Sequence, residues 1–466
     1  MFPTSLRLRH ALALFALLPF VLGAGSGLAA AAGTPPPAAW SQFQGSPAHT
    51  GTVSSITPAQ PPYSRAWTFR EPDSDLGFAA PVVLGDVAIA LGSKAVYGVD
   101  LSSGQQAWRV ARAGGPITEP AIGTAAGRTL IVYADGGLNQ EPSKLIAIDA
   151  ATQKPVWSVA LGAASVSGVS VDGSLAFVGD TQGVLHAVDI AKGTQKWTSK
   201  GTGRIEAPPA VAGGLVYAGS RELQQGNATI RAVEESSGTQ KWLFAQQQLA
   251  SGSAITVSDG RAIAGFTDRL ARAFDAASGS GKWTALMSNA VSPRGAPAAA
   301  TGAVYLADLA GTLERVSADS GSREWSYRFN AIRSLPIPYL EFWSSPVLTG
   351  TSVLIGLGDG RLAAVSTATG HLQWESDTGP GALGGIALGN GIVVVAKQGV
   401  NGGLIGFRHD ASGALVDEAS PTEIDAGQLL GRFVSAFVIV LGIAALAGSL
   451  IRRRDRSDDG PIGAES

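Results

Sequence analysis

A motif that ends in tryptophan recurs along most of this chain and restricts its fold more than any other feature. Each copy has an apolar stretch, an acidic residue, a turn containing glycine, and then a tryptophan eight residues after the acid. The tryptophans of the series are Trp67, Trp108, Trp157, Trp197, Trp242, Trp283, Trp325 and Trp374, spaced about 44 residues apart. An eighth copy of the motif, at 405–417, lacks the tryptophan. A period of this length indicates a repeat architecture.

The residue types of the motif fit a short hairpin. Apolar residues alternate before the acid, as they do in a strand with one buried face. The acid, for example Asp100, can accept hydrogen bonds from the backbone amides of a turn. The glycine, for example Gly104, can adopt the positive φ that a tight turn needs. Ser317, Ser366 and His409 replace the acid in three copies, and we expect their turns to be braced less tightly.

A second pattern precedes each copy of the motif. It consists of a small residue or proline followed by two short apolar runs around glycine, as at 80–89. The two patterns together give about four short strands per period, which is one blade of a β-propeller. We therefore predict an all-β, eight-bladed β-propeller of four-stranded blades, with seven blades as the alternative. Because Trp67 precedes the first blade, we expect its strand to complete the last blade and close the ring.

The composition excludes several classes of protein. Charged residues make up 15% of the chain and the net charge is −2, so no basic surface for nucleic acid is indicated. The chain has no cysteine. It therefore has no disulfide, thiolate metal site, thiol nucleophile or lipidated N-terminal cysteine. An exported chain without disulfides needs a large conventional core, which a propeller supplies.

The N-terminal residues have the pattern of a secretory signal peptide. Basic residues, Arg7 and Arg9, precede an apolar stretch at 11–22, and small residues follow. The alternative is an uncleaved N-terminal anchor. We favour cleavage because the apolar stretch is short and runs into a stretch of glycine and alanine.

The C-terminal residues have the pattern of a membrane span. The stretch from Phe433 to Ile451 contains no charged residue, and its length is close to the ~20 residues that cross a bilayer. Arginines at 452–454 follow at once, which places the tail in the cytoplasm under the positive-inside rule. We predict a single-pass protein of the cell membrane with its propeller outside the cytoplasm. A buried core helix is the alternative.

The repeats resemble those of a known family. The pattern Asp-x-x-[Ser/Thr]-Gly-x-x-x-Trp resembles the tryptophan-docking motif of the quinoprotein (PQQ-like) β-propeller repeat family. The stretch 40–51, Trp-Ser-Gln-Phe-Gln-Gly-Ser-Pro-Ala-His-Thr-Gly, is similar to the segment that often introduces such propellers. The resemblance covers roughly residues 40–417. The predicted order is a signal peptide (1–32), a lead-in segment (33–60), the PQQ-like propeller (61–420), a juxtamembrane linker (421–432), a transmembrane helix (433–451) and a cytoplasmic tail (452–466).

The resemblance implies two different functions. One branch of the family is the PQQ-dependent dehydrogenases, in which the propeller holds the quinone and a calcium ion near its axis. The other branch is non-catalytic and includes the propeller lipoprotein of the outer-membrane β-barrel assembly machinery. A fold alone does not choose between them.

Several absences argue against the dehydrogenase branch. The large dehydrogenases stack PQQ against a disulfide between adjacent cysteines, and this chain has no cysteine. Asp73 and Asp75 form a carboxylate pair, which we interpret as part of a solvated loop. The histidines are scattered along the chain, at His10, His49, His186, His371 and His409. We therefore expect no cofactor and no metal, with PQQ and calcium as the alternative.

An irregular insertion at 330–345 is the candidate binding loop. It carries Arg333, Tyr339, Phe342 and Trp343 beside two prolines. Aromatic residues and arginine are enriched at protein interfaces. Trp343 lies outside the repeat series, so it is not a docking tryptophan. The alternative is a loop that buries these aromatics itself over one mouth of the ring.

These observations favour a non-catalytic, membrane-tethered, extracytoplasmic β-propeller. We expect it to act as a protein-binding scaffold or a cell-envelope assembly factor. Its partner would be an envelope or membrane protein that the sequence does not identify, with bilayer contact through 433–451 and no nucleic acid. The alternatives are a PQQ-dependent quinoprotein oxidoreductase and a sensor ectodomain.

Overall fold

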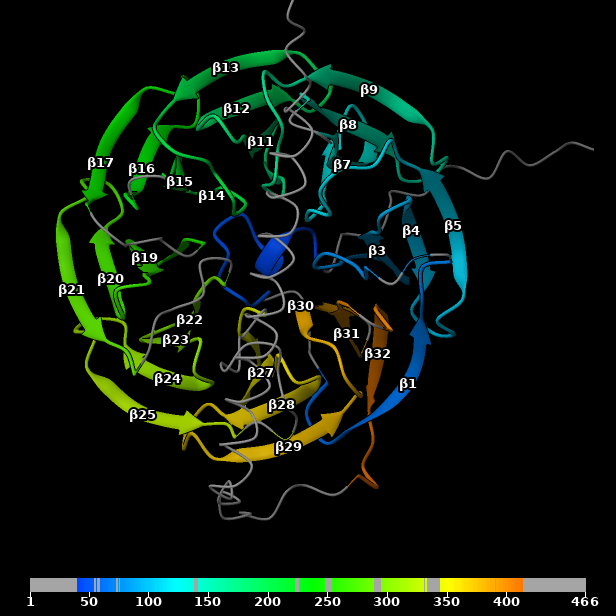
Figure 1. The fold of residues 1–466 in the computed structure, drawn as a ribbon, viewed down its shortest axis with the longest axis vertical. Helices are drawn as coiled ribbons and strands as arrows, with labels where there is room; N and C mark the ends of the chain where they lie inside the picture. Colours follow the sequence, from blue (N-terminus) through cyan, green and yellow to red (C-terminus); the bar gives the residue numbers. More distant parts are fainter. Residues whose placement is uncertain are drawn as a thin grey trace, which may run out of the picture. The chain divides into compact units, whose positions relative to one another are not determined.

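The chain forms a closed ring of eight four-stranded antiparallel sheets around one axis (Figure 1). The structure is a computed structural model that describes residues 40–413 except 54–55, 57–58, 73, 75, 138–140, 223–225, 248–253, 289–294, 331, 333–343, 390 and 400. The all-β propeller of eight four-stranded blades is thereby confirmed, and the seven-bladed alternative is wrong. The described residues contain one short helical element, the 3-10 helix η1 (Phe43–Gly45).

Seven blades each use four consecutive strands, ordered from the axis outwards. The first four of these blades are β2 (Val82–Leu84), β3 (Val87–Leu91), β4 (Ala95–Asp100), β5 (Gln106–Ala111); β6 (Ala121–Ala125), β7 (Arg128–Gly136), β8 (Ser143–Asp149), β9 (Pro155–Ala160); β10 (Ser170–Asp172), β11 (Leu175–Gly179), β12 (Val184–Asp189), β13 (Gln195–Lys200); and β14 (Ala210–Ala212), β15 (Leu215–Arg221), β16 (Ala228–Glu234), β17 (Gln240–Gln246). The next three are β18 (Thr256–Ser258), β19 (Arg261–Gly265), β20 (Leu270–Asp275), β21 (Gly281–Leu286); β22 (Ala298–Ala300), β23 (Ala303–Ala307), β24 (Thr312–Ser317), β25 (Arg323–Arg328); and β26 (Val347–Thr349), β27 (Ser352–Gly356), β28 (Arg361–Ser366), β29 (Leu372–Asp377).

The eighth blade combines the two ends of the propeller. Its strands, from the axis outwards, are β30 (Leu383–Gly389), β31 (Ile392–Lys397), β32 (Gly403–His409) and β1 (Tyr63–Phe69). In Figure 1 the blue β1 lies along the orange β32. Trp67 of β1 pairs with Gly406 of β32. The prediction that the strand of Trp67 completes the last blade is therefore confirmed.

Six of the repeated tryptophans join their blade to the next one. The indole N–H of Trp67 donates to the Leu101 carbonyl oxygen at 2.8 Å. The same contact recurs in the pairs Trp157–Ile190, Trp197–Glu235, Trp242–Ala276, Trp283–Ala318 and Trp325–Thr367. The indole ring of Trp67 also lies against Gly104, where an added Cβ would stand 2.5 Å from the ring. The glycine is therefore needed for both its positive φ and its missing side chain.

The acid of the motif braces the turn between the third and fourth strands. Asp100 accepts hydrogen bonds from the backbone N–H groups of Ser102 and Ser103, at 3.1 and 2.8 Å. Hydrogen bonds from the hydroxyls and amides of these two serines lower the pKa of Asp100 to about 2. The sequence pattern thus predicted this turn correctly.

The turns without the acid differ from each other. Ser317 accepts from the N–H groups of Asp319 and Ser320 at 3.3 and 3.4 Å, longer than the contacts of Asp100. After β32, Asp410 accepts from the Ser412 N–H at 3.0 Å. The acid in the last copy is therefore displaced by one residue, and the expectation of a weakly braced turn at His409 is wrong.

The predicted membrane segments fall outside the part of the chain that the structure describes. This applies to the signal peptide at 1–32, the span at 433–451 and the tail at 452–466. Among the described residues, no helix has the length and hydropathy needed to span a membrane.

Candidate functional site

The stretch 40–51, which we call the axial segment, fills the centre of the ring. Figure 1 shows η1 at the centre of the blades. Backbone hydrogen bonds tie the axial segment to six innermost strands, through the pairs Trp40–Val83, Ser41–Ile122, Pro47–Val211, Ala48–Val257, Thr50–Ala299 and Gly51–Leu348. A seventh strand, β10, is bound by the side chain of Gln42, whose amide donates to and accepts from the Val171 backbone. The axial segment therefore holds seven of the eight blades from inside.

His49 lies fully buried within the axial segment. Its Nδ1 lies 3.1 Å from the Ile255 carbonyl oxygen, so Nδ1 carries the proton and donates it. Its Nε2 accepts from the Ser170 hydroxyl at 3.3 Å. Burial lowers the pKa of His49 to about 4, against the smaller opposite effect of the Ile255 hydrogen bond. His49 is therefore neutral and structural at physiological pH.

The residues around the axis do not fit a quinone and a calcium ion. Phe43 packs there against a ring of alanines from four blade connections: Ala80, Ala207, Ala254 and Ala296. The side chains of alanine and phenylalanine offer no oxygen ligands to a hard cation. Within the described ranges, no group of three or more His, Asp or Glu residues could hold a metal ion. The predicted carboxylates Asp73 and Asp75 lie outside the described residues.

The two faces of the ring differ in how regular their connections are. The face that carries the first-to-second and third-to-fourth strand connections is called the regular face. Its connections are always two residues and five residues long, respectively. The opposite face, called the variable face, carries the second-to-third connections and the connections between blades. These range from three to six and from five to 18 residues. Because function on repeat scaffolds concentrates in variable loops, the variable face is the candidate site.

Buried charges stiffen the variable face. Arg112 forms an ion pair with Asp135 at 3.0 Å and donates to the Gly92 carbonyl oxygen at 2.8 Å. Glu71 accepts from the N–H groups of Ser93 and Lys94 at 2.8 and 2.7 Å. Burial acts to raise the pKa of Glu71, but these hydrogen bonds outweigh it and the pKa is lowered. The loops of this face are therefore held on a rigid base.

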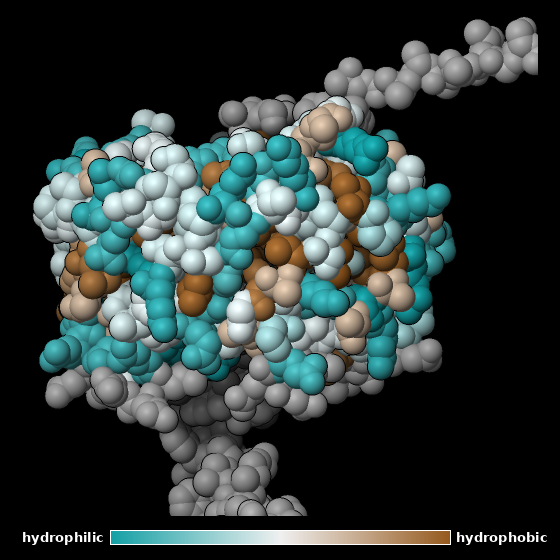
Figure 2. All heavy atoms as spheres, turned by 90° about the horizontal axis from the view of Figure 1, so that it is seen from above, coloured by the Kyte–Doolittle hydropathy of each residue, from teal (hydrophilic) through white to brown (hydrophobic). Residues whose placement is uncertain are grey.

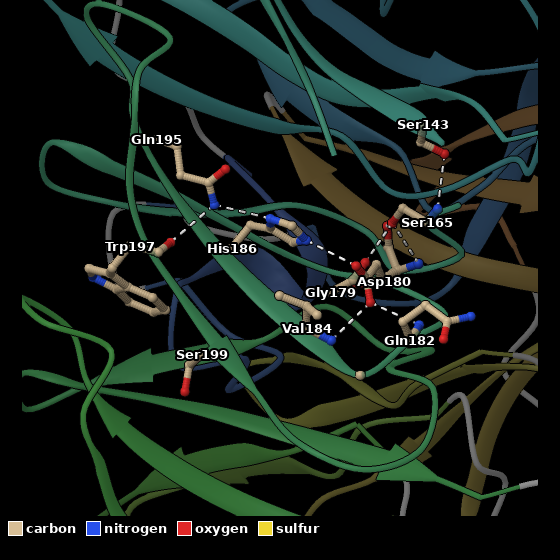
Figure 3. A network of polar contacts seen from close by, with 12 residues as sticks. Ser143, Ser165, Gly179, Asp180, Gln182, Val184, His186, Gln195, Trp197 and Ser199 are labelled. Carbon is tan, nitrogen blue, oxygen red and sulfur yellow. Dashed lines mark hydrogen bonds and ion pairs between the residues drawn. The ribbon is translucent and has the colours of Figure 1, made fainter. Parts of the chain in front are cut away.

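A buried polar network braces the third blade (Figure 3). Asp180 accepts from the N–H groups of Gln182 and Val184, at 2.9 and 2.8 Å. The Nε2 of His186 lies 3.0 Å from Asp180, and the amide of Gln195 donates to Nδ1 at 3.1 Å. The proton of His186 is therefore on Nε2. Since Asp180 and His186 are both buried, this network supports the fold and offers no surface to a ligand.

The predicted binding loop belongs to the variable face. It is the connection between β25 and β26, which at 18 residues is the longest in the ring. Arg333, Tyr339, Phe342 and Trp343 themselves lie outside the described residues. The described base of the loop is pinned, because the Ile332 N–H donates to Asp359 at 3.2 Å.

Exposed apolar side chains give a second reason to favour the variable face. Among the described residues, the large exposed ones are Leu76, Leu243, Leu286 and Ile332. Leu76 and Ile332 are in connections of the variable face, and Leu286 is the last residue of β21 at that face. On the side wall, Figure 2 shows apolar residues in separate small groups divided by hydrophilic ones. On the side seen there, the described residues form no large apolar patch.

Sequence reasoning missed the axial segment and the polar network. The similarity of 40–51 to a lead-in segment gave no indication that it lies inside the ring. Similarly, His186 stood out only as one of several scattered histidines. One signal was available in the sequence. At one strand position of the repeat, where we would expect an apolar residue, several copies have a polar or charged one: His186, Arg231, Arg272 and Glu314.

The fold and the repeats define a PQQ-like β-propeller, and its described axial residues do not fit a quinone and a calcium ion. The family model described as "Outer membrane protein assembly factor BamB" matches residues 141–292 and 226–409, more than half of the chain. The chain belongs to this family.

Curated relatives carry the same description. The BamB of Burkholderia pseudomallei is 27% identical over 240 residues, which cover 49% of this chain and 60% of the relative. The BamB of Yersinia pestis is 26% identical over 252 residues, covering 48% and 61%. The matches thus span about 60% of the length of these relatives.

Solved structures share the propeller. BamB from Moraxella catarrhalis superimposes with a TM-score of 0.58 at 21% identity, covering 74% of this chain and all of the other. A quinohemoprotein alcohol dehydrogenase from Pseudomonas putida HK5 gives 0.61 at 14% identity, covering 83% and 82%. Identities this low relate the folds alone.

Proposed function

We propose that this chain is a non-catalytic propeller that binds a protein of the cell envelope through its variable face and acts as an assembly scaffold. The observation that carries the proposal is the confinement of all connections of unequal length to that one face. Its family description and the names of its relatives, which are assembly factors, support the same function.

The predicted span at 433–451 would tether the propeller to a membrane. β32 ends at His409 on the regular face, so the chain leaves the ring there. The residues between the ring and the span could extend to roughly 80 Å, at up to ~3.5 Å per residue. In this arrangement the regular face is the one nearer the bilayer, and the variable face is presented to the partner.

Site-specific photo-crosslinking of the full chain in its own cells tests the proposed face. A photoreactive residue at Trp343 or Leu286 should give an adduct with the same envelope protein. The same probe at Thr152, in a turn of the regular face, should give none. Adducts from Thr152 alone would overturn the assignment of the face.

Truncation of an exposed side chain gives the matched control. Leu286→Ala on the variable face should lower the adduct yield from Trp343, and Leu243→Ala on the side wall should not. Both leucines are more than half exposed, at 61% and 51%, so neither change should shift the melting temperature by more than a degree or two.

The oxidoreductase alternative needs its own measurement. Adding PQQ and calcium to the purified protein should leave its tryptophan fluorescence unchanged. Saturable quenching together with reduction of an acceptor dye by alcohols would contradict the scaffold function.

A further inference from the structure

Two tryptophans of the repeat series, Trp108 and Trp374, make no indole hydrogen bond to a described residue. Trp374 is nonetheless well held, because its ring packs edge-on against Tyr63 and Phe407, with centroids 5.0 and 5.9 Å apart. Trp108 packs against no aromatic ring in the described part of the chain. It faces the seam between the first blade (β2–β5) and the second (β6–β9), which we call the first seam. The outer rim of the first seam therefore has neither kind of support.

A glutamine has taken the acceptor that Trp108 would use. In the six bonded pairs, the indole donates to the residue that directly follows the acid position of the next blade. In the second blade that residue is Ala150, and its carbonyl oxygen instead accepts from the side-chain amide of Gln153 at 2.7 Å. Gln153 stands where every other copy of the motif has glycine. The missing hydrogen bond thus coincides with the one departure from glycine.

The turn that contains Gln153 otherwise resembles the turns with glycine. Asp149 braces it through two backbone N–H groups, at 3.0 and 2.9 Å. The φ of Gln153 is +56°, and that of the equivalent Gly193 is +67°. A Cβ added to Gly193 would stand 2.5 Å from the docked ring of Trp157. Since Gln153 has a Cβ at this position, Trp108 cannot dock as Trp157 does.

The variable-face end of the first seam is held by a buried arginine. Arg112 donates to the Gly92 carbonyl oxygen of the first blade at 2.8 Å, and it forms an ion pair with Asp135 of the second blade at 3.0 Å. The side chains of Arg112 and Asp135 are 0% and 5% exposed. Breaking a buried ion pair is strongly destabilising. This end of the seam therefore stays closed.

The inner edge of the first seam is also held. The axial segment binds Val83 of the first blade and Ile122 of the second through two neighbouring residues, Trp40 and Ser41. The turn of Gln153 is a third-to-fourth connection, so it belongs to the regular face. Of these three contacts across the seam, the absent one is at the outer rim of the regular face.

We propose that the first seam is the hinge of the ring, which opens at the outer rim of the regular face while Arg112 and the axial segment hold its other two edges. The inference goes beyond the proposed function and does not depend on what the variable face binds. Opening at this rim lets the first and second blades tilt apart without separating the connections of the variable face. A single residue, Gln153, creates the hinge.

Thiol labelling of the full chain tests the hinge, because the chain has no cysteine of its own. Ile148 is fully buried in an apolar cluster that contains residues of both the first and the second blade. In Ile148→Cys, the thiol should react with a small thiol reagent at a rate that changes little with low concentrations of denaturant, as local opening predicts. Adding Gln153→Gly should slow the reaction about fivefold or more, because the Trp108 hydrogen bond then has to break first.

Two further variants serve as matched controls. Gln153→Asn keeps a Cβ in a residue that tolerates positive φ, so it should leave the labelling of Ile148→Cys fast. Val188 is the equivalent fully buried residue at the seam between the second and third blades. Gly193→Gln should speed the labelling of Val188→Cys, because it creates the same obstruction at that seam.

The comparison at Ile148 decides the proposal even if Gly193→Gln prevents folding. Gln153→Gly restores the residue of the other copies, so circular dichroism should show an unchanged fold. Equal labelling rates of Ile148→Cys with and without Gln153→Gly would overturn the hinge. A labelling rate that rises with denaturant as steeply as global unfolding does would overturn it as well, since the thiol would then be exposed only in the unfolded chain.

Discussion

Individual glycines and tryptophans set how closely adjacent blades approach. The indole of Trp67 lies between Gly406 of its own blade and Gly104 of the next, where added Cβ atoms would stand 2.2 and 2.5 Å from the ring. The acid of the motif holds the turn that presents the glycine. Each seam between blades thus depends on a few residues whose spacing the sequence repeats.

Gly104→Ala should destabilise the protein much more than a matched glycine change. The left-handed backbone costs alanine about 1–2 kcal/mol, and the clash with Trp67 adds about 1–3 kcal/mol of overpacking. Gly127 has φ +72° but nothing within 4 Å of an added Cβ, so Gly127→Ala carries the backbone cost alone. Denaturant unfolding of both variants measures the difference. Equal losses of unfolding free energy in the two variants would show that the indole of Trp67 moves aside without an energetic penalty.

The axial segment acts as a single element that ties the inner strands together. It contributes backbone groups to six strands and the Gln42 amide to a seventh. Unpaired backbone groups of innermost strands would be costly to bury. The axial segment satisfies them and fills the centre with Phe43 and His49.

Stability should fall in mildly acidic solution because of His49. Its pKa is about 4 when folded and about 6.5 when unfolded, so the unfolded chain binds the extra proton between these values. The contribution of the neutral ring is fully present above pH 6.5 and is lost as the pH falls towards 4, up to roughly 3 kcal/mol.

His49→Asn isolates this effect, since asparagine can still donate to the Ile255 carbonyl oxygen and has no proton to gain. Between pH 7.5 and pH 4.5, the melting temperature of the unmodified protein should fall further than that of the variant. Identical drops would mean that His49 does not titrate in this range.

At the scale of the whole molecule, the ring is closed twice. β1 pairs with β32 on the outside of the eighth blade, and the axial segment binds seven blades on the inside. The two closing elements, β1 and the axial segment, both belong to the N-terminal part of the described chain. An open repeat array can unfold from its ends, whereas this ring has no free terminal blade. The closed ring is also the rigid base on which the variable face is built.

Trp67→Ala should therefore lower the stability of the whole ring. Removing a buried tryptophan costs about 3–5 kcal/mol. Trp67 is the docking tryptophan of the seam between the eighth blade and the first, where the ring closes. Thermal unfolding followed by tryptophan fluorescence and by far-ultraviolet circular dichroism should show one coincident transition at a lower temperature. A separate early transition would indicate that the eighth blade opens independently.

The sequence alone determined the repeat, the four strands per blade, the turn chemistry and the closing role of the strand of Trp67. These follow from local spacing, because a period-2 strand and an acid–glycine turn are encoded within a few consecutive residues. The candidate binding loop at 330–345 and the membrane span at 433–451 remain predictions, and they too are based on local sequence patterns.

Only the tertiary structure decided what lies at the axis and which charges meet on the variable face. His49 contacts Ile255 and Ser170, which are 206 and 121 residues away. Arg204 meets Arg221 only because Gly203 lets a blade connection approach the end of β15. No local pattern encodes such contacts, since each requires the closed ring to bring distant segments together.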